Sequence, residues 1–462
     1  MTSAGRATAE LGSFAAGLRF DDLPDATVAQ LKRSILDTLG CGLHGSSLEW
    51  CRSMQSLVQA DRSFGAASAW GTTFMASRTQ AAWLNATAAH SFEFDDVHMG
   101  GMIHPGALTL SSSLAVGQSS SASGRDLLTS MAAGCEVAAR VGRAVGTPHF
   151  LLGFHPQGTV GVFAAAAAAA RTMGCNAMAT QHALAIGASH SSGLMGAQRG
   201  AMSKRLHSGH AAQSGVQAAL LAATGFTGMA DALEAQYGGF CSTLGGGDVN
   251  LGLLTAGLGT TWESEQVAFK PYPSCAAALS SIEATRLLRL QHDLDSSKIQ
   301  TVRVTTSHHA HVHSGWAYEP EGVTAAQMSI VYGVARMLLD GRLDAASFED
   351  AAIASPDVVA FCQRIEVVAD RRIDDLGPEH RYQASVEVVT TDSVFRIEVD
   401  DRPGNISNPL RDDDLRDKFL AQAVKRIGEN AARDVVDIVS SIEDVEDVNQ
   451  LASLLAEQPV RS

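Results

Sequence analysis

The sequence predicts a mainly α-helical fold in which a smaller α+β domain is inserted into a large helical domain. Three observations support this prediction. Alanine-rich segments that end in glycine dominate the first half of the chain, alternating apolar and polar residues follow, and charged helical segments return near the C-terminus. We therefore expect one helical domain formed by residues 1–265 and 405–462, with an α+β domain at 266–404.

Helices are expected throughout the first part of the chain. Val162 to Gly174 and Gly215 to Gly225 are rich in alanine, the best helix former, and each ends at a glycine, a common helix terminator. Aromatic residues make up only 6% of the chain. The alanine run from Ala164 to Ala170 therefore predicts closely packed helices.

Strands are expected in the second part. Ile299 to Thr306 alternates apolar and polar residues, and Ala384 to Thr391 with Val394 to Val399 is typical of a hairpin. Between these strands, Ala325 to Leu339 and Phe348 to Phe361 are predicted to be helical. This mixture indicates an α+β domain.

Composition excludes several classes of function. The chain has 462 residues, which favours two domains, and its net charge of -15 argues against a nucleic-acid or acidic-membrane surface. No stretch resembles a membrane span or a secretory signal. Seven scattered cysteines without a CxxC pair indicate a reducing compartment, and no iron–sulfur or structural zinc site. We expect a cytoplasmic protein without a nucleotide-binding loop, a GxSxG elbow or an HExxH motif.

A short segment rich in acids and histidines is the strongest candidate for chemistry. Asp95 and Asp96 are adjacent carboxylates, and His90, His98 and His104 lie close to them in the sequence. Such a density of titratable groups favours general acid–base catalysis. One aspartate is then a general base; the alternative is a helix cap and its neighbour.

Basic or titratable side chains recur where helices are expected to begin. His104 and His155 each precede a proline, a residue favoured in the first turn of a helix, and Lys204 and Arg205 come just before another expected helix. Free backbone N–H groups and the helix dipole favour anions at such positions. The recurrence suggests a carboxylate-binding pocket, with ordinary structural or solvated side chains as the alternative.

Lys270 stands in a proline-rich segment at the expected entrance to the α+β domain. Pro271 and Pro273 give a stiff, extended backbone on which a lysine can be aimed at a substrate. An ordinary interdomain linker is the alternative.

Four histidines, at 308, 309, 311 and 313, follow the first predicted strand. In an extended run His309, His311 and His313 would share one face and could bind zinc or nickel. No carboxylate or cysteine accompanies them at ligand spacing, so we assign no metal here. A strand end that lines a pocket and a solvated loop are the alternatives.

Several segments together resemble the MmgE/PrpD superfamily, which includes 2-methylcitrate dehydratase, cis-aconitate decarboxylase and iminodisuccinate epimerase. The resemblance covers most of the chain from about 30 to 345. Two segments, Ala197 to Gly209 and His313 to Ser329, look most like the cis-aconitate decarboxylase branch. The motifs that carry the resemblance are HSFEFDDVH with IHPGA, GFHPQGTVG, GLMGAQRGAMSKRLHSGHAAQSG, GFTG with YGGF, FKPYPSC, and HSGW followed by QMS.

This resemblance implies a homodimer without a cofactor, in which an α+β lid covers a helical main domain and the substrate is a small di- or tricarboxylate. The implied catalytic residues are Asp95 or Asp96, His104, His155, Lys204 and Lys270, and the implied substrate-binding residues are Gln198, Arg205, His311 and His313. The decarboxylases place a tyrosine close before the HisxGlyTrp motif, where this chain has His311; Tyr318 and Tyr332 are nearby but offset.

The reaction that the resemblance implies is proton transfer at a carbon next to a carboxylate. We expect decarboxylation of cis-aconitate to itaconate. The alternatives are epimerisation of an amino-dicarboxylate such as iminodisuccinate, dehydration of 2-methylcitrate or citrate, and a catalytically silent homologue that only binds carboxylates.

Overall fold

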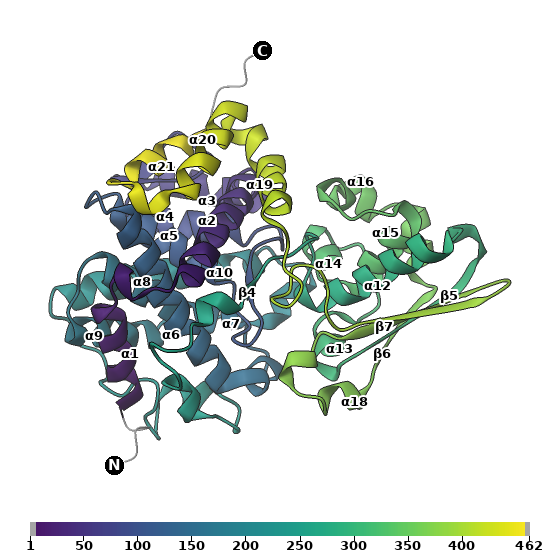
Figure 1. Cartoon of the computed structure of the whole chain (residues 1–462), viewed down its shortest axis with the longest axis horizontal. Helices are drawn as coiled ribbons and strands as arrows, with labels where there is room; N and C mark the ends of the chain where they lie inside the picture. Colours follow the sequence, from purple (N-terminus) through teal and green to yellow (C-terminus); the bar gives the residue numbers. More distant parts are fainter. Residues whose placement is uncertain (1–5, 458–462) are drawn as a thin grey trace. The chain divides into compact units, whose positions relative to one another are not determined.

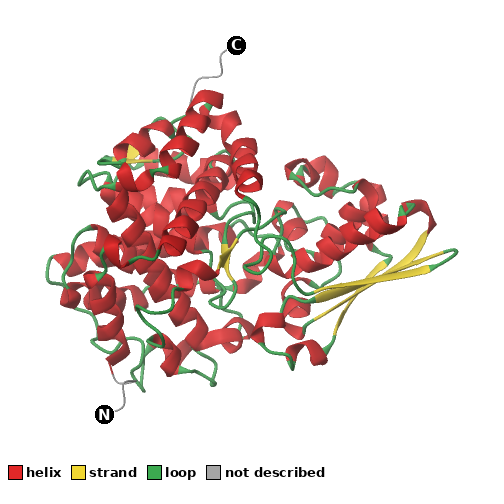
Figure 2. Cartoon of the chain, in the orientation of Figure 1, coloured by secondary structure: helices red, strands yellow, loops and turns green. Residues whose placement is uncertain are grey.

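The computed structural model describes residues 6–457 of the chain (Figure 1). Contacts divide the chain into two compact units. The first comprises Met1–Met195, Ser203–Val267 and Arg411–Ser462, and the second comprises Gly196–Met202 and Ala268–Leu410. Helices make up most of the first unit, whereas a four-stranded sheet with its own helices forms the second (Figure 2). The predicted fold class, mainly helical with a smaller α+β part, is confirmed.

The first unit contains the three longest helices of the described chain. Its N-terminal helices are α1 (Ala7–Gly17), α2 (Asp25–Gly45), α3 (Glu49–Ala60), α4 (Arg78–Ala89), α5 (Pro105–Gly117), α6 (Gly124–Leu151), α7 (Pro156–Thr159), α8 (Gly161–Thr172), α9 (Ala177–Ala188), α10 (Ser203–Ala223) and α11 (Phe240–Leu244). Its C-terminal helices are α19 (Asp412–Ile427), α20 (Glu429–Ser440) and α21 (Asn449–Leu454). Short strands occur at β1 (Ala67–Ser68), β2 (Met75–Ala76) and β3 (Val97–His98). No helix within residues 6–457 combines the length and hydrophobicity that crossing a membrane requires.

Small residues set the packing of this unit. Helix α8 packs against α5, α6, α9 and α10. Every alanine from Ala164 to Ala170 is fully buried. Gly215 on α10 faces this run so closely that an added Cβ would lie 2.5 Å from the Cβ of Ala165. The predicted close packing of the alanine helix is therefore correct, because only small side chains fit at this spacing.

Both ends of the chain contribute to the first unit. Helix α19 packs against α2, and Lys418 on α19 makes a buried ion pair with Asp37 on α2 at 2.6 Å. The same ammonium donates a hydrogen bond to the carbonyl of Phe94 at 2.6 Å. Helix α19 thereby anchors the loop that carries Asp95 and Asp96.

The second unit is built on a sheet with the strand order β6-β5-β7-β8. The strands are β5 (Ile299–Thr306), β6 (Ile365–Ala369), β7 (Ala384–Thr390) and β8 (Val394–Val399). β6 runs parallel to β5, whereas β7 is antiparallel to both β5 and β8. Helix α12 (Ala276–His292) contacts β7 and β8 and packs against α15 (Ile330–Asp340). Buried valines of β5 and β7, such as Val304 and Val386, form the core of this unit.

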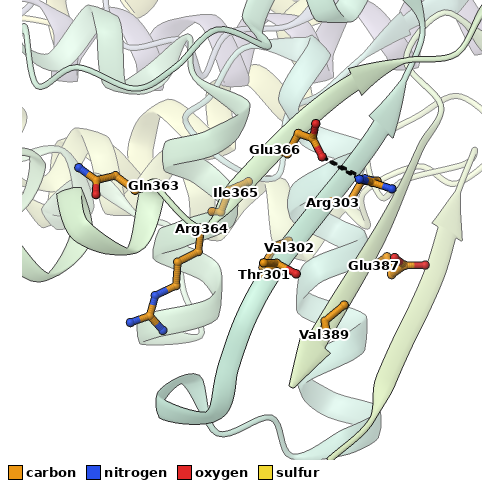
Figure 3. Close-up of a pocket in the computed structure, with 9 residues that line it drawn as sticks. All are labelled: Thr301, Val302, Arg303, Gln363, Arg364, Ile365, Glu366, Glu387 and Val389. Atoms are coloured by element: carbon orange, nitrogen blue, oxygen red, sulfur yellow. Dashed lines mark hydrogen bonds and ion pairs between the residues drawn. The ribbon is translucent and has the colours of Figure 1, made fainter. Parts of the chain in front are cut away.

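The opposite face of the sheet is open and charged (Figure 3). A groove of about 410 Å³ there is lined by residues of β5, β6 and β7, among them Arg303, Glu366 and Glu387. Arg303 and Glu366 form an ion pair at 3.0 Å, with more than half of each side chain exposed. The strand alternation predicted for residues 299–306 thus separates a buried from a solvated face.

Four local features differ from the sequence-based expectation. Strand β6 was not predicted. The helix expected from Ala325 to Leu339 is two helices, α14 (Val323–Gln327) and α15, because Ser329 caps α15 by accepting from the N–H of Tyr332. The helix expected at 348–361 is likewise divided, since Pro356 starts a new helix. The histidine-rich segment is helix α13 (His308–Ser314), neither strand nor loop, because Ser307 caps it.

The remaining elements of the described chain are short. They are α16 (Asp350–Ile353), α17 (Pro356–Cys362), α18 (Arg371–Asp374), β4 (Val267–Ala268) and the 3-10 turns at Phe20–Asp22, Met195–Arg199, Leu251–Leu254, Glu263–Gln266, Ser296–Lys298, Ala345–Phe348, Pro378–His380 and Ile442–Asp444.

Candidate active site

The Asp95 carboxylate lies between two imidazoles in the first unit. His90 follows the last residue of α4, and His104 immediately precedes α5, so both helix ends point side chains at the loop between them. Oδ2 of Asp95 is 2.8 Å from Nδ1 of His90 and 3.4 Å from Nδ1 of His104. Asp95 and His90 are fully buried, and His104 is 13% exposed. The structure therefore brings one acid and two potential proton carriers together.

The backbone fixes which nitrogen of His104 can react. Nδ1 of His104 lies 2.6 Å from the carbonyl oxygen of Asp96. A carbonyl only accepts, so Nδ1 carries a hydrogen and Nε2 is the atom left for proton exchange. The N–H of His104 also donates to Oε1 of Gln157 at 2.8 Å, and Gln157 donates back to the His104 carbonyl. These contacts hold the imidazole in one orientation.

Asp96 has different partners from Asp95. Its two oxygens accept the N–H of Gly106 at 3.1 Å, and Oδ2 accepts the Ser34 hydroxyl at 2.9 Å. Burial, with the neighbouring Asp37 and Asp95 carboxylates adding to it, raises the pKa of Asp96 well above its usual range. Asp96 therefore caps the start of α5, the alternative raised for this pair from the sequence.

His90 is a site residue that the sequence reasoning left unassigned. Its ring centroid is 4.7 Å from that of His104 and 5.7 Å from that of His155. Burial lowers the pKa of His90, although the Asp95 carboxylate opposes that shift. Its Nε2 has no hydrogen-bond partner among the described residues. The available signal was its place in the same acidic-histidine motif.

His155 is paired with a second unassigned histidine. Nδ1 of His155 lies 2.8 Å from Nδ1 of His207, and the two ring centroids are 5.1 Å apart. His155 precedes α7, and its N–H donates to the carbonyl of Gly193 at 3.0 Å. Burial, followed by the positive charge of Lys204, lowers the pKa of His155 well below its usual value and that of His207 to about 4.

Lys204 and Arg205 share one carboxylate. Both side chains contact Oε1 of Glu93, and all three groups are buried. The two cations lie inside the first turn of α10, a correction to the expectation that they precede the helix. Glu93 has a φ of 54°, the left-handed region that few non-glycine residues adopt. This cluster was not predicted, because Glu93 is far from α10 in the sequence.

Four predicted site residues belong to the second unit. Lys270 is fully buried and follows Phe269, whose N–H donates to the carbonyl of Gly404 at 3.0 Å. Gln198 is buried, and its Oε1 has no hydrogen-bond partner among the described residues. His313 is buried on α13, where its ring stacks on that of His309 at 6.0 Å, and His311 is half-buried.

Two sets of side chains were considered as metal sites. Ligand atoms of His90, Asp95 and His104 all lie within 4.8 Å of one another, which gives a donor set of two imidazoles and a carboxylate. Hydrogen bonds already use Nδ1 of both histidines. In the part of the chain that the structure describes, no third potential ligand joins His309 and His313 with all three ligand atoms within 4.8 Å of one another.

The tyrosines near the histidine-rich helix have their hydroxyls engaged. Tyr318 donates to the carbonyl of Ile353 at 2.8 Å, and Tyr332 donates to the carbonyl of Ser347. Their rings pack together with a centroid separation of 4.9 Å. Burial raises the pKa of both hydroxyls.

Comparison with known proteins matches both parts of the chain to one family. Residues 9–251 match the MmgE/PrpD N-terminal domain and residues 272–444 match the MmgE/PrpD C-terminal domain. The chain is 28% identical to cis-aconitate decarboxylase-like protein oryM of Aspergillus oryzae, over 98% of each chain. It is 28% identical to cis-aconitate decarboxylase of Aspergillus terreus, over 98% of this chain and 96% of that protein. It is 29% identical to the human cis-aconitate decarboxylase, over 95% of this chain and 92% of that protein.

Proposed function

The chain belongs to the MmgE/PrpD family, and on that premise we propose that it is a cofactor-independent lyase that converts cis-aconitate to itaconate. Enzymatic activity of the lyase or dehydratase type follows from the family and its relatives. The choice of substrate is supported by relatives named cis-aconitate decarboxylase that align along nearly the whole chain.

The observation that carries the proposal is the grouping of Asp95, His104 and His155 around the buried ring of His90. Proton transfer at a carbon next to a carboxylate needs an acid or base held within reach of that carbon. It also needs positive charge for the enolate-like state that forms. Lys204 adds an ammonium to this neighbourhood, since its charge lowers the pKa of His155 and His207.

In the proposed reaction the bond between a substrate carbon and its carboxylate breaks, and CO2 leaves. The alkene carbon takes up one proton, so cis-aconitate and a proton give itaconate and CO2. His104 and His155 supply and return protons, and Asp95 fixes the imidazole of His104. Asp96, as the cap of α5, positions His104 rather than exchanging protons.

The negative charge of the substrate needs cations to balance it. We assign Lys204 and Lys270 to the developing negative charge, and Gln198, Arg205, His311 and His313 to the substrate carboxylates. Because Glu93 already neutralises part of the charge of Lys204 and Arg205, Lys270 is an essential part of this proposal.

Two other reactions stay as candidates because of one residue. His311 stands where the decarboxylases, as compared by motif, carry a tyrosine, and the hydroxyls of Tyr318 and Tyr332 donate to backbone carbonyls. Without a phenol at that place, epimerisation of iminodisuccinate and dehydration of 2-methylcitrate or citrate stay as candidates. Epimerisation and dehydration each begin with the removal of a proton from a carbon next to a carboxylate.

Incubation of the enzyme with cis-aconitate, 2-methylcitrate, citrate and iminodisuccinate, followed by NMR of the products, tests the proposal. We expect itaconate from cis-aconitate, with rates that are the same before and after treatment with EDTA. His104→Ala, His155→Ala and Lys270→Ala should each lower kcat by about 100-fold or more. Carboxylate binding without any product would show a silent homologue. Loss of activity on chelation, restored by added metal, would show that His90, Asp95 and His104 hold an ion.

A further inference from the structure

We propose that His207 supplies solvent protons to His155, so that the two imidazoles form the proton-entry route of the active site. This inference rests on the proposed function, in which each turnover consumes one proton. His207 acts through His155 and does not touch the substrate.

One hydrogen lies between the two rings. Their Nδ1 atoms are 2.8 Å apart, a hydrogen-bond distance at which two N–H groups would clash and two lone pairs would repel. A neutral imidazole carries one N–H and one lone pair. One ring is therefore protonated on Nδ1 and the other on Nε2, and moving the shared hydrogen changes which ring is the donor.

Burial changes along the pair in the direction that proton entry requires. His155 is 5% exposed and its ring lies beside that of the fully buried His90. His207, in the second turn of α10, is only half-buried. The pair therefore spans the distance between the buried cluster and the more accessible side of the first unit.

Two glycines leave room for both rings. An added Cβ at Gly193 would lie 3.4 Å from Cγ of His207 and 3.5 Å from Cβ of His155, and the φ of Gly193 is +141°. An added Cβ at Gly158 would lie 2.2 Å from the carbonyl of Ser192 and 3.3 Å from Cβ of His207. A side chain at Gly158 would clash with the backbone, whereas at Gly193 the contacts are ordinary and the positive φ is what favours glycine.

The charges around the pair favour neutral rings between turnovers. Lys204 lies on the same helix as His207, and its charge, together with those of His90 and His210, lowers the pKa of His207 after burial. Lys204, His207, His90 and His104 act in the same direction on His155. Because a ring with a lowered pKa holds an added proton weakly, a proton that enters at His207 is passed on to His155 rather than retained.

The proton movements balance in one cycle. At the start His207 donates its Nδ1 hydrogen to His155, whose own hydrogen is on Nε2. A solvent proton adds to Nε2 of His207, the shared hydrogen moves to Nδ1 of His155, and His155 gives its Nε2 hydrogen to the substrate carbon. Both rings are then neutral again with the tautomers exchanged. Between turnovers the shared hydrogen returns to Nδ1 of His207, Nε2 of His207 loses its proton to solvent, and Nε2 of His155, no longer covered by substrate, takes one up, which restores the starting state.

Variants of His207 test this route. In His207→Ala we expect kcat for cis-aconitate to fall about 10- to 100-fold with KM nearly unchanged, because proton delivery is lost and the site is intact. Added imidazole should restore part of kcat, since a half-buried position leaves a space that a small base can enter. His207→Gln can still bond to His155 but cannot relay a proton, so its kcat should be equally low.

A matched control is His190→Gln, because His190 is also half-buried and its ring forms no hydrogen bond with His155 in the described part of the chain. Its kcat should equal that of the wild type and should not respond to imidazole. Wild-type kcat in His207→Ala or in His207→Gln would overturn the relay alone. A low kcat in His207→Ala that imidazole does not raise would assign His207 a purely structural role. Absence of turnover of every carboxylate by the wild-type enzyme would overturn the proposed function, and the relay with it.

Discussion

Oδ2 of Asp95 lies 2.8 Å from Nδ1 of His90, and neither side chain is exposed. A carboxylate only accepts hydrogen bonds, so Nδ1 of His90 carries the hydrogen. A buried charge needs such a partner, because water cannot solvate it. His90 therefore fixes the position of Asp95, which in turn contacts His104.

Removal of His90 should reveal this role. In His90→Ala we expect kcat to fall at least about tenfold, since Asp95 loses the donor that orients it. His90→Asn places an amide N–H near the former Nδ1 and should recover part of that loss. Steady-state kinetics of both variants give the comparison. Equal rates in His90→Asn and His90→Ala would mean that the hydrogen bond to Asp95 is unimportant.

The two adjacent aspartates should respond differently to amide substitution. Asp95→Asn is expected to lower kcat about 100- to 10,000-fold with little change in Tm, because the charge beside His104 is lost. Asp96→Asn should keep kcat within about tenfold, since its carboxyl has a raised pKa and serves Gly106 and Ser34 as a cap. Paired measurements of kcat and Tm decide between them. The reverse order of effects would assign catalysis to Asp96.

Glu93 should be important for stability. Glu93→Gln leaves the buried Lys204 and Arg205 without their shared carboxylate, and we expect the free energy of unfolding to fall by about 3–5 kcal/mol. Glu366→Gln is the matched control, because its ion pair with Arg303 is exposed and should contribute less than about 1 kcal/mol. Urea denaturation of both variants measures the difference. A similar small loss in both would mean that the cations find other partners.

Acidification should destabilise the protein partly through His44. Burial, with the nearby charge of Lys425 adding to it, lowers the pKa of His44 from 6.5 to about 4, so between these values the unfolded chain binds more protons than the folded one. Stability is therefore expected to fall as the pH falls from about 6.5 to about 4. His44→Gln should make the fall less steep in urea denaturation measured across this range. An unchanged slope would mean that His44 is protonated in the folded protein.

Local sequence patterns predicted several elements well. The alternation in residues 299–306 and the hairpin that follows correspond to β5, β7 and β8, and glycines end or follow several helices. Strand β6 was not predicted because its five residues are half-buried or exposed and show no regular alternation. The histidine-rich segment was misread because the Ser307 cap, a single hydrogen bond, decides for a helix.

What the sequence determined by itself was the fold class, the family motifs and the candidate residues Asp95, His104, His155 and Lys204, because these depend on residue types at short spacing. Only the tertiary structure separated Asp95 from Asp96, since the two adjacent side chains meet different partners. It also joined His155 to His207, 52 positions apart, and Glu93 to Lys204, 111 positions apart. Such pairs depend on how helices pack, and no local pattern encodes a contact between segments so distant in the chain.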